Sequence, residues 1–306
     1  MLTSEKSFIP RISDWICTVN CPEDLYLDLL KRTLTASDYD ESYWRVIEGS
    51  GKEISLRHPI RSLKAFGRQM ILIARAVFGG SLMLVDRRRP DPAAREEGMD
   101  WPCFGYSMAG HKAIDNVRFC VEDVIRNGVP GDFIETGVWR GGMVIYMRAL
   151  LKVYGVTDRV VWLADSFEGL PAPKSSSDGI DLSYVSYLKV SLEDVETNFR
   201  RFGLLDGQVR FLKGWFCDTL PEAPVERLAI LRLDGDMYSS TMDALTGLYH
   251  KVSPGGYVIV DDYFSWDSCR AAVTDFLASR NIQVDLQRVD GSRVFWQVTG
   301  DHPQPI

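Results

Sequence analysis

The chain of 306 residues is long enough for one large domain or two small ones, and its net charge of −7 offers no basic field for a nucleic-acid partner. Its six cysteines lack the paired Cys or His spacing of a zinc site, so we expect reduced thiols. The first residues lack the apolar core of a cleavable signal peptide, which predicts a cytoplasmic protein.

The amino-terminal third combines an amphipathic helix with a longer apolar segment. Residues 25–34 carry leucines at helical spacing. Residues 69–85 are apolar but interrupted, and they are shorter than the about 20 apolar residues of a transmembrane helix, so we expect no stable membrane insertion. We expect this segment to cover the active site or to form a homo-oligomer contact, with a membrane-surface helix as the alternative. Residues 87–97, charged and proline-bearing, are expected to form an exposed linker.

From residue 113 onward the sequence predicts a helix followed by a parallel sheet with crossover helices. The helix spans residues 113–126. Short apolar runs then alternate with helical stretches, as is typical of an α/β fold. The expected strands are 132–136, 160–164, 209–213, 228–233 and 257–261, and the expected helices are 142–154, 191–202, 240–251 and 266–279. Pro254-Gly255-Gly256 predicts a stop before the fifth strand, and Asp290-Gly291 predicts a hairpin between residues 282–288 and 293–298.

Carboxylates stand at the ends of two of these apolar runs. Asp234 follows the run at 231–233, and Asp261 and Asp262 follow the run at 257–260. If the two strands are parallel neighbours, these side chains converge where open α/β sheets place their ligands. Carboxylates that converge in this way repel one another unless a cation compensates their charge, and an all-oxygen set of ligands suits Mg²⁺. The alternative is that each Asp only begins a solvated loop.

Three successive strand ends carry features of a nucleoside site with an amino-acid tail. The first strand leads from Glu135 and Thr136 into a turn containing Gly137, where backbone N–H groups can bind an anionic group. This is no G-x-G-x-x-G or Walker fingerprint, which disfavours a dinucleotide or ATP. Asp165, with Ser166 beside it, can accept hydrogen bonds from ribose hydroxyls, and Gly214-Trp215-Phe216 offers aromatic surface for adenine. In this order the features predict S-adenosylmethionine, although Asp165 as a loop cap and Trp215 as a core residue remain alternatives.

Four segments together resemble the macrocin O-methyltransferase family. They are GDFIETGVWRGG at 131–142, DSFEGLP at 165–171, RLDGDMY at 232–238 and DDY at 261–263. The resemblance covers about residues 98–299, and residues 24–35 are similar to the family's first helix. Enzymes of this family methylate sugar hydroxyls of antibiotics with S-adenosylmethionine and magnesium.

The resemblance implies a fold and a set of roles. The fold would be a Rossmann-like, class I methyltransferase α/β domain, whose seven-stranded, mostly parallel sheet has an antiparallel last strand, at residues 98–306. Residues 1–97 would be a helical extension or lid with an inserted segment. Asp234, Asp261 and Asp262 would be magnesium ligands and Asp236 the general base. The donor would contact Glu135, Gly137, Asp165 and a covering segment formed by Tyr106, Ser107 and Met108, after which Ala109-Gly110-His111-Lys112 is more polar than the family pattern.

The expected function is therefore magnesium-dependent O-methylation of a sugar hydroxyl in a glycosylated natural product. Residues 44–91 do not align to the family pattern, so the resemblance implies no particular acceptor. A metal-dependent methyltransferase of catechol-like acceptors is the enzymatic alternative. A non-catalytic scaffold and a nicotinamide dehydrogenase are further alternatives, and the missing phosphate-binding glycines disfavour the dehydrogenase.

Overall fold

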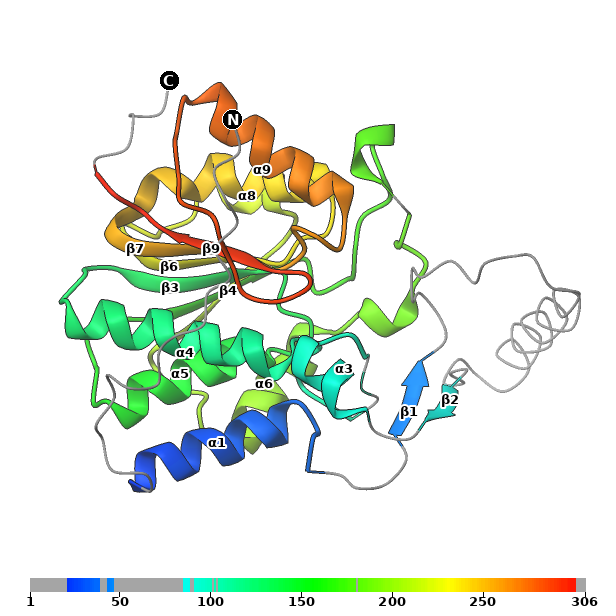
Figure 1. Cartoon of the computed structure of the whole chain (residues 1–306), viewed down its shortest axis with the longest axis vertical. Coiled ribbons are helices and arrows are strands. Elements are labelled where there is room, and N and C mark those ends of the chain that lie inside the picture. The colour runs from blue at the N-terminus through cyan, green and yellow to red at the C-terminus, as the bar shows by residue number, and fades with distance from the viewer. Residues whose placement is uncertain are drawn as a thin grey trace, which may run out of the picture.

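A seven-stranded sheet forms the centre of the molecule (Figure 1). The computed structural model describes residues 21–38, 43–46, 85–88, 91–100, 102, 104–179 and 181–300. Within these residues the strand order is β5-β4-β3-β6-β7-β9-β8. The strands are β3 (Asp132–Thr136), β4 (Val161–Asp165), β5 (Val209–Lys213), β6 (Leu228–Leu233), β7 (Val252–Val260), β8 (Gln287–Arg288) and β9 (Val294–Gln297). The first five run parallel, whereas β9 is antiparallel to both β7 and β8. This arrangement confirms the predicted mostly parallel sheet.

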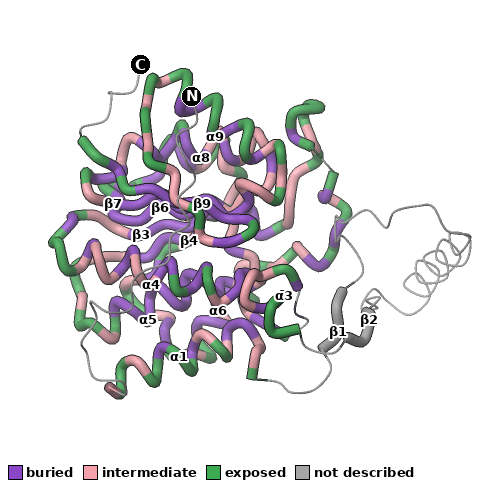
Figure 2. Tube along the Cα trace, in the orientation of Figure 1, coloured by how far each residue is buried: buried purple, intermediate pink, exposed green. Residues whose placement is uncertain are grey.

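Helices cover both faces of the sheet (Figure 1). One face carries α4 (His111–Arg126), α5 (Gly142–Val153) and α6 (Leu192–Arg201), and the other carries α8 (Tyr238–Leu248) and α9 (Asp267–Ser279). Successive strand residues face opposite sides, so Phe133 belongs to the core under α4 and α5, and Ile134 to the core under α8 and α9. The central strands β3, β4, β6 and β7 are consequently largely buried on both faces (Figure 2), whereas β5 and β8 at the ends of the sheet are partly exposed. The helices expected after residue 110 are all present, with ends that differ by a few residues.

The Pro254-Gly255-Gly256 segment, which we expected to end the preceding element before the fifth strand, lies inside β7. Leu228 pairs with Val252, but Ile230 pairs with Tyr257, so the extra residues of β7 form an irregularity in the ladder. Gly255 adopts φ +85°, and a Cβ on Gly256 would lie 2.9 Å from the Ala229 carbonyl oxygen. Pro-Gly-Gly therefore allows a bulge with close backbone approach rather than ending the strand.

Helix α1 (Pro22–Leu34) lies outside α4 and α5 and completes that side of the core. Cys21 caps it by accepting a hydrogen bond from the Asp24 N–H. The helix is longer than predicted, and its buried stripe is Leu27, Leu30 and Leu34, whereas Leu25 and Leu29 are exposed. The remaining described cysteines, Cys120, Cys217 and Cys269, are free, like Cys21.

The expected exposed linker at 87–97 is wrong for its second half. Helix α3 (Pro92–Glu97) begins at the cap Asp91 and ends at Gly98 in a left-handed conformation. Its Arg95 is buried and donates to Asp100 with a distance of 2.7 Å. The Asp-Pro and Gly signals are those of a capped helix, and they outweigh the charge of the segment.

The remaining described elements before α3 are the antiparallel strands β1 (Tyr43–Val46) and β2 (Val85–Arg88). The predicted helix or oligomer contact at 69–85 lies outside the described residues, except for its last residue. No helix of the described chain is long and apolar enough to cross a membrane. The domain boundary at residue 97 and the homo-oligomer stay predictions.

The packing of α1 gives a first test. Replacing the fully buried Leu27 by Ala should lower the free energy of unfolding by about 2–5 kcal/mol, because transfer and cavity costs add. Leu29→Ala, on the exposed face of the same helix, should change it by less than about 0.5 kcal/mol. Urea denaturation followed by circular dichroism measures both. Equal losses in the two variants would contradict the packing of α1.

Candidate active site

Two adjoining cavities, each of about 360 Å³, open at the carboxyl ends of the parallel strands. The first extends from the ends of β4 and β5 to the start of α8. The second lies over the ends of β3, β6 and β7. Both are lined by Met108, Trp139, Leu188, Asp234 and Asp236. A ligand can therefore extend from one cavity into the other.

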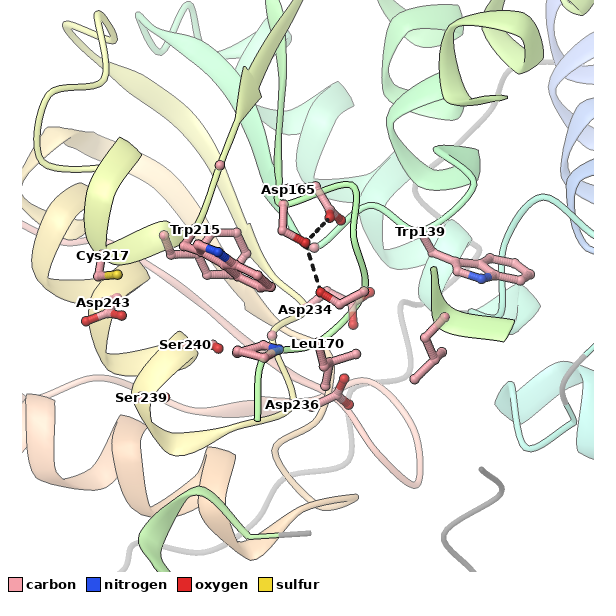
Figure 3. Close-up of a pocket in the computed structure, with 18 of the residues that line it drawn as sticks. Trp139, Asp165, Leu170, Trp215, Cys217, Asp234, Asp236, Ser239, Ser240 and Asp243 are labelled. Carbon is pink, nitrogen blue, oxygen red and sulfur yellow. Dashed lines mark hydrogen bonds between the residues drawn. The ribbon is translucent and has the colours of Figure 1, made fainter. Parts of the chain in front are cut away.

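The first cavity is shaped by turns that follow β3, β4 and β5. Gly137 has φ +88°, and a Cβ there would lie 1.8 Å from the Asp234 carbonyl oxygen, so only glycine fits. Asp165 accepts from the backbone N–H groups of Val138 at 2.8 Å and Phe167 at 2.7 Å, and thereby holds two turns together. Figure 3 shows Trp215 and Trp139 on opposite sides of this cavity, with Asp165, Asp234 and Asp236 between them.

The second cavity contains a cluster of carboxylates from neighbouring strands. Asp234, Asp261 and Asp262 each bring one oxygen within 4.8 Å of the others. Glu135 at the end of β3 and Asp236 after β6 line the same cavity. The predicted convergence of the three Asp residues is therefore present, because β6 and β7 are parallel neighbours.

Two buried arginines compensate part of this negative charge. Arg232, inside β6, donates to Asp234 Oδ2 at 2.7 Å and also to Glu135 and Asp261. Arg293, which precedes β9, donates to both oxygens of Asp261 at 2.7 and 2.9 Å. Of the five carboxylates, Glu135, Asp234 and Asp261 thus pair with the two guanidinium groups, and Arg293 also pairs with Asp290. The cluster retains an excess of negative charge when all members are ionised.

The pKa values of the carboxyl groups follow from this imbalance. Burial, aided by repulsion among the carboxylates, raises the pKa of Glu135 to about 8, that of Asp234 to about 6 and that of Asp236 to about 7. The pKa of Asp262 is raised well above its usual range for the same reasons. Burial acts on Asp261 as well, but Arg232 and Arg293 outweigh it and lower its pKa.

Two oxygens of the cluster lack a hydrogen-bond donor among the described residues. They are Asp262 Oδ2 and Glu135 Oε2, both buried. A buried, unpaired carboxylate oxygen is costly, so it fits a cation or a donor supplied by a ligand. The all-oxygen set of Asp234, Asp261 and Asp262 fits a hard divalent ion such as Mg²⁺.

The cavities bring together nearly all of the residues predicted to bind a donor. The first is lined by Gly137, Asp165, Ser166, Gly214, Trp215 and Phe216, the second by Tyr106, Ser107 and Glu135, and both by Met108. Thr136 lines neither. It is buried in β3, and its hydroxyl lies 3.4 Å from the Arg232 carbonyl oxygen. The residues next to it in the chain line the cavities instead.

His111 also lines neither cavity. Its ring nitrogens lie 3.1 Å from Glu96 Oε2 and from the Ser37 hydroxyl oxygen, at the start of α4. Through His111, the polar segment that follows Met108 thus connects the start of α4 to residues earlier in the chain. This contact is structural.

Sequence reasoning missed four residues of the site: Arg232, Arg293, Trp139 and Trp266. Arg232 did carry a signal, because a charged residue between apolar strand residues requires a buried partner. Trp139 stood within a quoted motif without a role. Arg293 and Trp266 gave no local signal, because their partners Asp261 and Asp236 are about 30 residues distant in sequence.

The raised pKa of Glu135 predicts a pH dependence of stability. An acid whose pKa is raised in the folded state binds its proton more tightly in the folded chain. Its contribution to the free energy of unfolding is therefore lost as the pH rises from its pKa of 4.5 in the unfolded chain towards about 8. The free energy of unfolding of the metal-free protein should fall over this window, by at most about 1.4 kcal/mol per pH unit for this group. Glu135→Gln should flatten the slope in urea titrations at several pH values, and identical slopes would contradict the burial of a titrating Glu135.

The comparison with known proteins agrees with this geometry. The family model of the macrocin O-methyltransferases (TylF) matches residues 23–298. The 8-demethyl-8-(2,3-dimethoxy-alpha-L-rhamnosyl)-tetracenomycin-C 4'-O-methyltransferase of Streptomyces olivaceus is 44% identical over 281 residues, which cover 90% of this chain and 93% of that protein. The demethyldecarbamoylnovobiocin O-methyltransferase of Streptomyces niveus is 52% identical over 210 residues, 67% of this chain and 80% of that one.

A comparison with a solved structure supports the same family. The O-methyltransferase NovP superposes with a TM-score of 0.74 at 42% identity, over 91% of this chain and all (100%) of its own. The chain therefore belongs to the macrocin O-methyltransferase family, as an O-methyltransferase of the S-adenosylmethionine-dependent type.

Proposed function

We propose that this enzyme uses magnesium and methylates a hydroxyl on the sugar of a glycosylated natural product. The observation that carries the proposal is the meeting of Asp234, Asp261 and Asp262 beside the donor-sized cavity. The names of the relatives support the acceptor class, since one of them includes a rhamnosyl group. The donor would occupy the first cavity and extend its amino-acid tail into the second, which would also hold the acceptor, with the shared residues at the junction.

For the methyl donor, we assign the adenosine to the first cavity. Trp215 and Phe216 offer aromatic surface to the adenine, and Asp165 and Ser166 lie where ribose hydroxyls can bind. Asp165 accepts hydrogen bonds from two backbone N–H groups, and its carboxylate oxygens still carry further lone pairs. The amino-acid tail would reach the turn at Gly137, where the unpaired Oε2 of Glu135 can accept from its ammonium group.

For the metal, we assign Asp234, Asp261 and Asp262 as ligands. When bound, Mg²⁺ supplies Lewis-acid polarisation of the acceptor oxygens and a template for neighbouring hydroxyls. Arg232 and Arg293 would orient two of the three ligands, because Arg232 donates to Asp234 and Asp261, and Arg293 donates to Asp261.

For the proton, we assign Asp236 as the general base. Its carboxylate lines both cavities, so it lies at the junction where donor and acceptor would meet. A pKa raised to about 7 suits a base that works near neutral pH. Asp236 would accept the hydroxyl proton while the hydroxyl oxygen forms its bond to the methyl carbon and the sulfonium leaves as a thioether.

The base assignment predicts a separation of binding from turnover. Asp236→Asn keeps the size of the side chain but removes its basicity, so turnover should fall at least about a hundredfold. Calorimetric titration should still detect S-adenosylmethionine and magnesium with affinities near those of the parent. Turnover near the parent rate with a sugar acceptor would refute the assignment.

The ligand assignment predicts a loss of metal affinity. Asp234→Asn should weaken magnesium binding about tenfold or more, because it removes one anionic oxygen from the set. The matched control is Asp243→Asn, since Asp243 lines the first cavity but is not a member of the Asp cluster. Magnesium titration by calorimetry, with chelator-treated protein, compares the variants. An unchanged dissociation constant in Asp234→Asn would exclude it as a ligand.

The acceptor class is tested by a panel of small molecules. Glycosylated macrolides, aminocoumarins and anthracyclines, free sugars and catechols would be supplied with S-adenosylmethionine and magnesium, and methylated products identified by mass spectrometry. Methylation of a sugar hydroxyl supports the proposal. Methylation confined to catechols would replace it by the catechol-type activity.

A further inference from the structure

Trp266 contacts residues that follow both of the strands carrying the proposed active-site carboxylates, β6 and β7. It precedes α9 and lines the second cavity. Its backbone N–H donates to the Asp262 carbonyl oxygen at 3.0 Å, so its position is tied to the end of β7. Its indole Nε1–H donates to Asp236 Oδ1 at 2.8 Å. One residue thus links the turn after β7 to the carboxylate that follows β6.

Asp236 itself has a backbone conformation that needs support. Its φ of +56° is in the left-handed region, which disfavours a residue with a Cβ. Ser268, on the first turn of α9, donates from its hydroxyl to the Asp236 carbonyl oxygen at 3.1 Å. The amino-terminal end of α9 therefore contacts Asp236 at its side chain through Trp266 and at its backbone through Ser268.

The Trp266 ring is itself held by packing. It contacts the small apolar cluster formed by Leu182, Val185 and Tyr187, of which Leu182 lines the second cavity. This packing restricts the indole to one orientation, so the hydrogen bond to Asp236 does not require a mobile side chain to be ordered for each turnover.

We propose that Trp266 is a positioning residue for the general base. By bonding Oδ1, the indole fixes the plane of the Asp236 carboxylate, which also contacts the Asp262 carboxyl group, and so sets the direction from which it accepts the proton of the acceptor hydroxyl. The inference rests on the proposed role of Asp236 and adds to it the residue that orients this base. A positioned base requires a fixed carboxylate plane, because proton transfer depends on the hydrogen-bond geometry between base and hydroxyl.

The test removes the indole N–H, and one of its two variants also keeps the bicyclic ring shape. Trp266→Phe is the simple variant, and incorporation of benzothienylalanine at position 266 replaces only the N–H by sulfur. In both, kcat should fall about tenfold to a hundredfold, as expected for loss of a hydrogen bond to a charged group. The affinities for S-adenosylmethionine and magnesium, and the KM of the acceptor, should stay within about twofold.

The matched control breaks the same kind of bond elsewhere. Trp162 donates its indole N–H to Asp132 Oδ2 at 2.8 Å, at the opposite end of the strands, and lines neither cavity. Trp162→Phe should lower stability but keep kcat within about twofold. A fall in kcat equal to that of the Trp266 variants would show a general effect of Trp loss and overturn the proposal.

A double-mutant cycle separates this inference from the proposed function. If Asp236 is the base, Asp236→Asn is nearly inactive, and adding Trp266→Phe to it should cause no further loss. Near-parent turnover in Asp236→Asn would overturn the base assignment and the inference with it. An inactive Asp236→Asn beside fully active Trp266 variants would overturn the inference alone, as would a raised acceptor KM with unchanged kcat.

A readout without turnover tests the contact itself. In ¹⁵N-labelled protein, the indole resonance of Trp266 is identified by its loss in Trp266→Phe. Asp236→Ala should move its proton shift upfield, because a hydrogen bond to a carboxylate is removed, while the Trp162 indole resonance stays in place. An unmoved Trp266 resonance would show that the indole does not bond Asp236 in solution.

Discussion

The shared guanidinium of Arg232 is the interaction on which the arrangement of the site depends. It is almost fully buried in β6 and pairs with Glu135 at the end of β3, with Asp234 and with Asp261 at the end of β7. A buried charge is tolerated only with well-placed partners of opposite sign. Because the three carboxylates come from three adjacent strand ends, those of β3, β6 and β7, one cation aligns the part of the sheet over which the second cavity opens.

The negative charge that remains after this pairing determines which ligands the site favours. Two arginines cannot neutralise five carboxylates, and burial together with the repulsion among them raises the pKa values of Glu135 and Asp236. The unpaired oxygens of Glu135 and Asp262 lie in the same cavity. Such a site is electrostatically incomplete, so ligands that bring positive charge, an ammonium group or a divalent cation, are favoured in it.

Backbone geometry gives the two cavities their shape. Gly137 lets the turn after β3 pass against the Asp234 carbonyl, and Asp165 joins that turn to the one after β4. The start of α9 then approaches from the other side through Trp266 and Ser268. The shape of the cavities is therefore set by these contacts within the protein, and their relative position by the strand order of the sheet.

The sequence by itself determined the features that depend on near neighbours along the chain. Strand and helix periodicity, the glycine turn after Glu135 and the carboxylates that follow β6 and β7 are local patterns, and each is present in the structure. Cap signals around α3 were also local, but the charge of the segment obscured them.

Only the tertiary structure decided which of these residues meet. The pairing of Arg293 with Asp261 and of Trp266 with Asp236 joins residues about 30 positions apart, and the exclusion of Thr136 depends on which face of β3 meets the cavity. The irregular start of β7 depends on its pairing with β6. The physical reason is that strand order and register set cross-strand neighbours, and no local propensity of the chain specifies either.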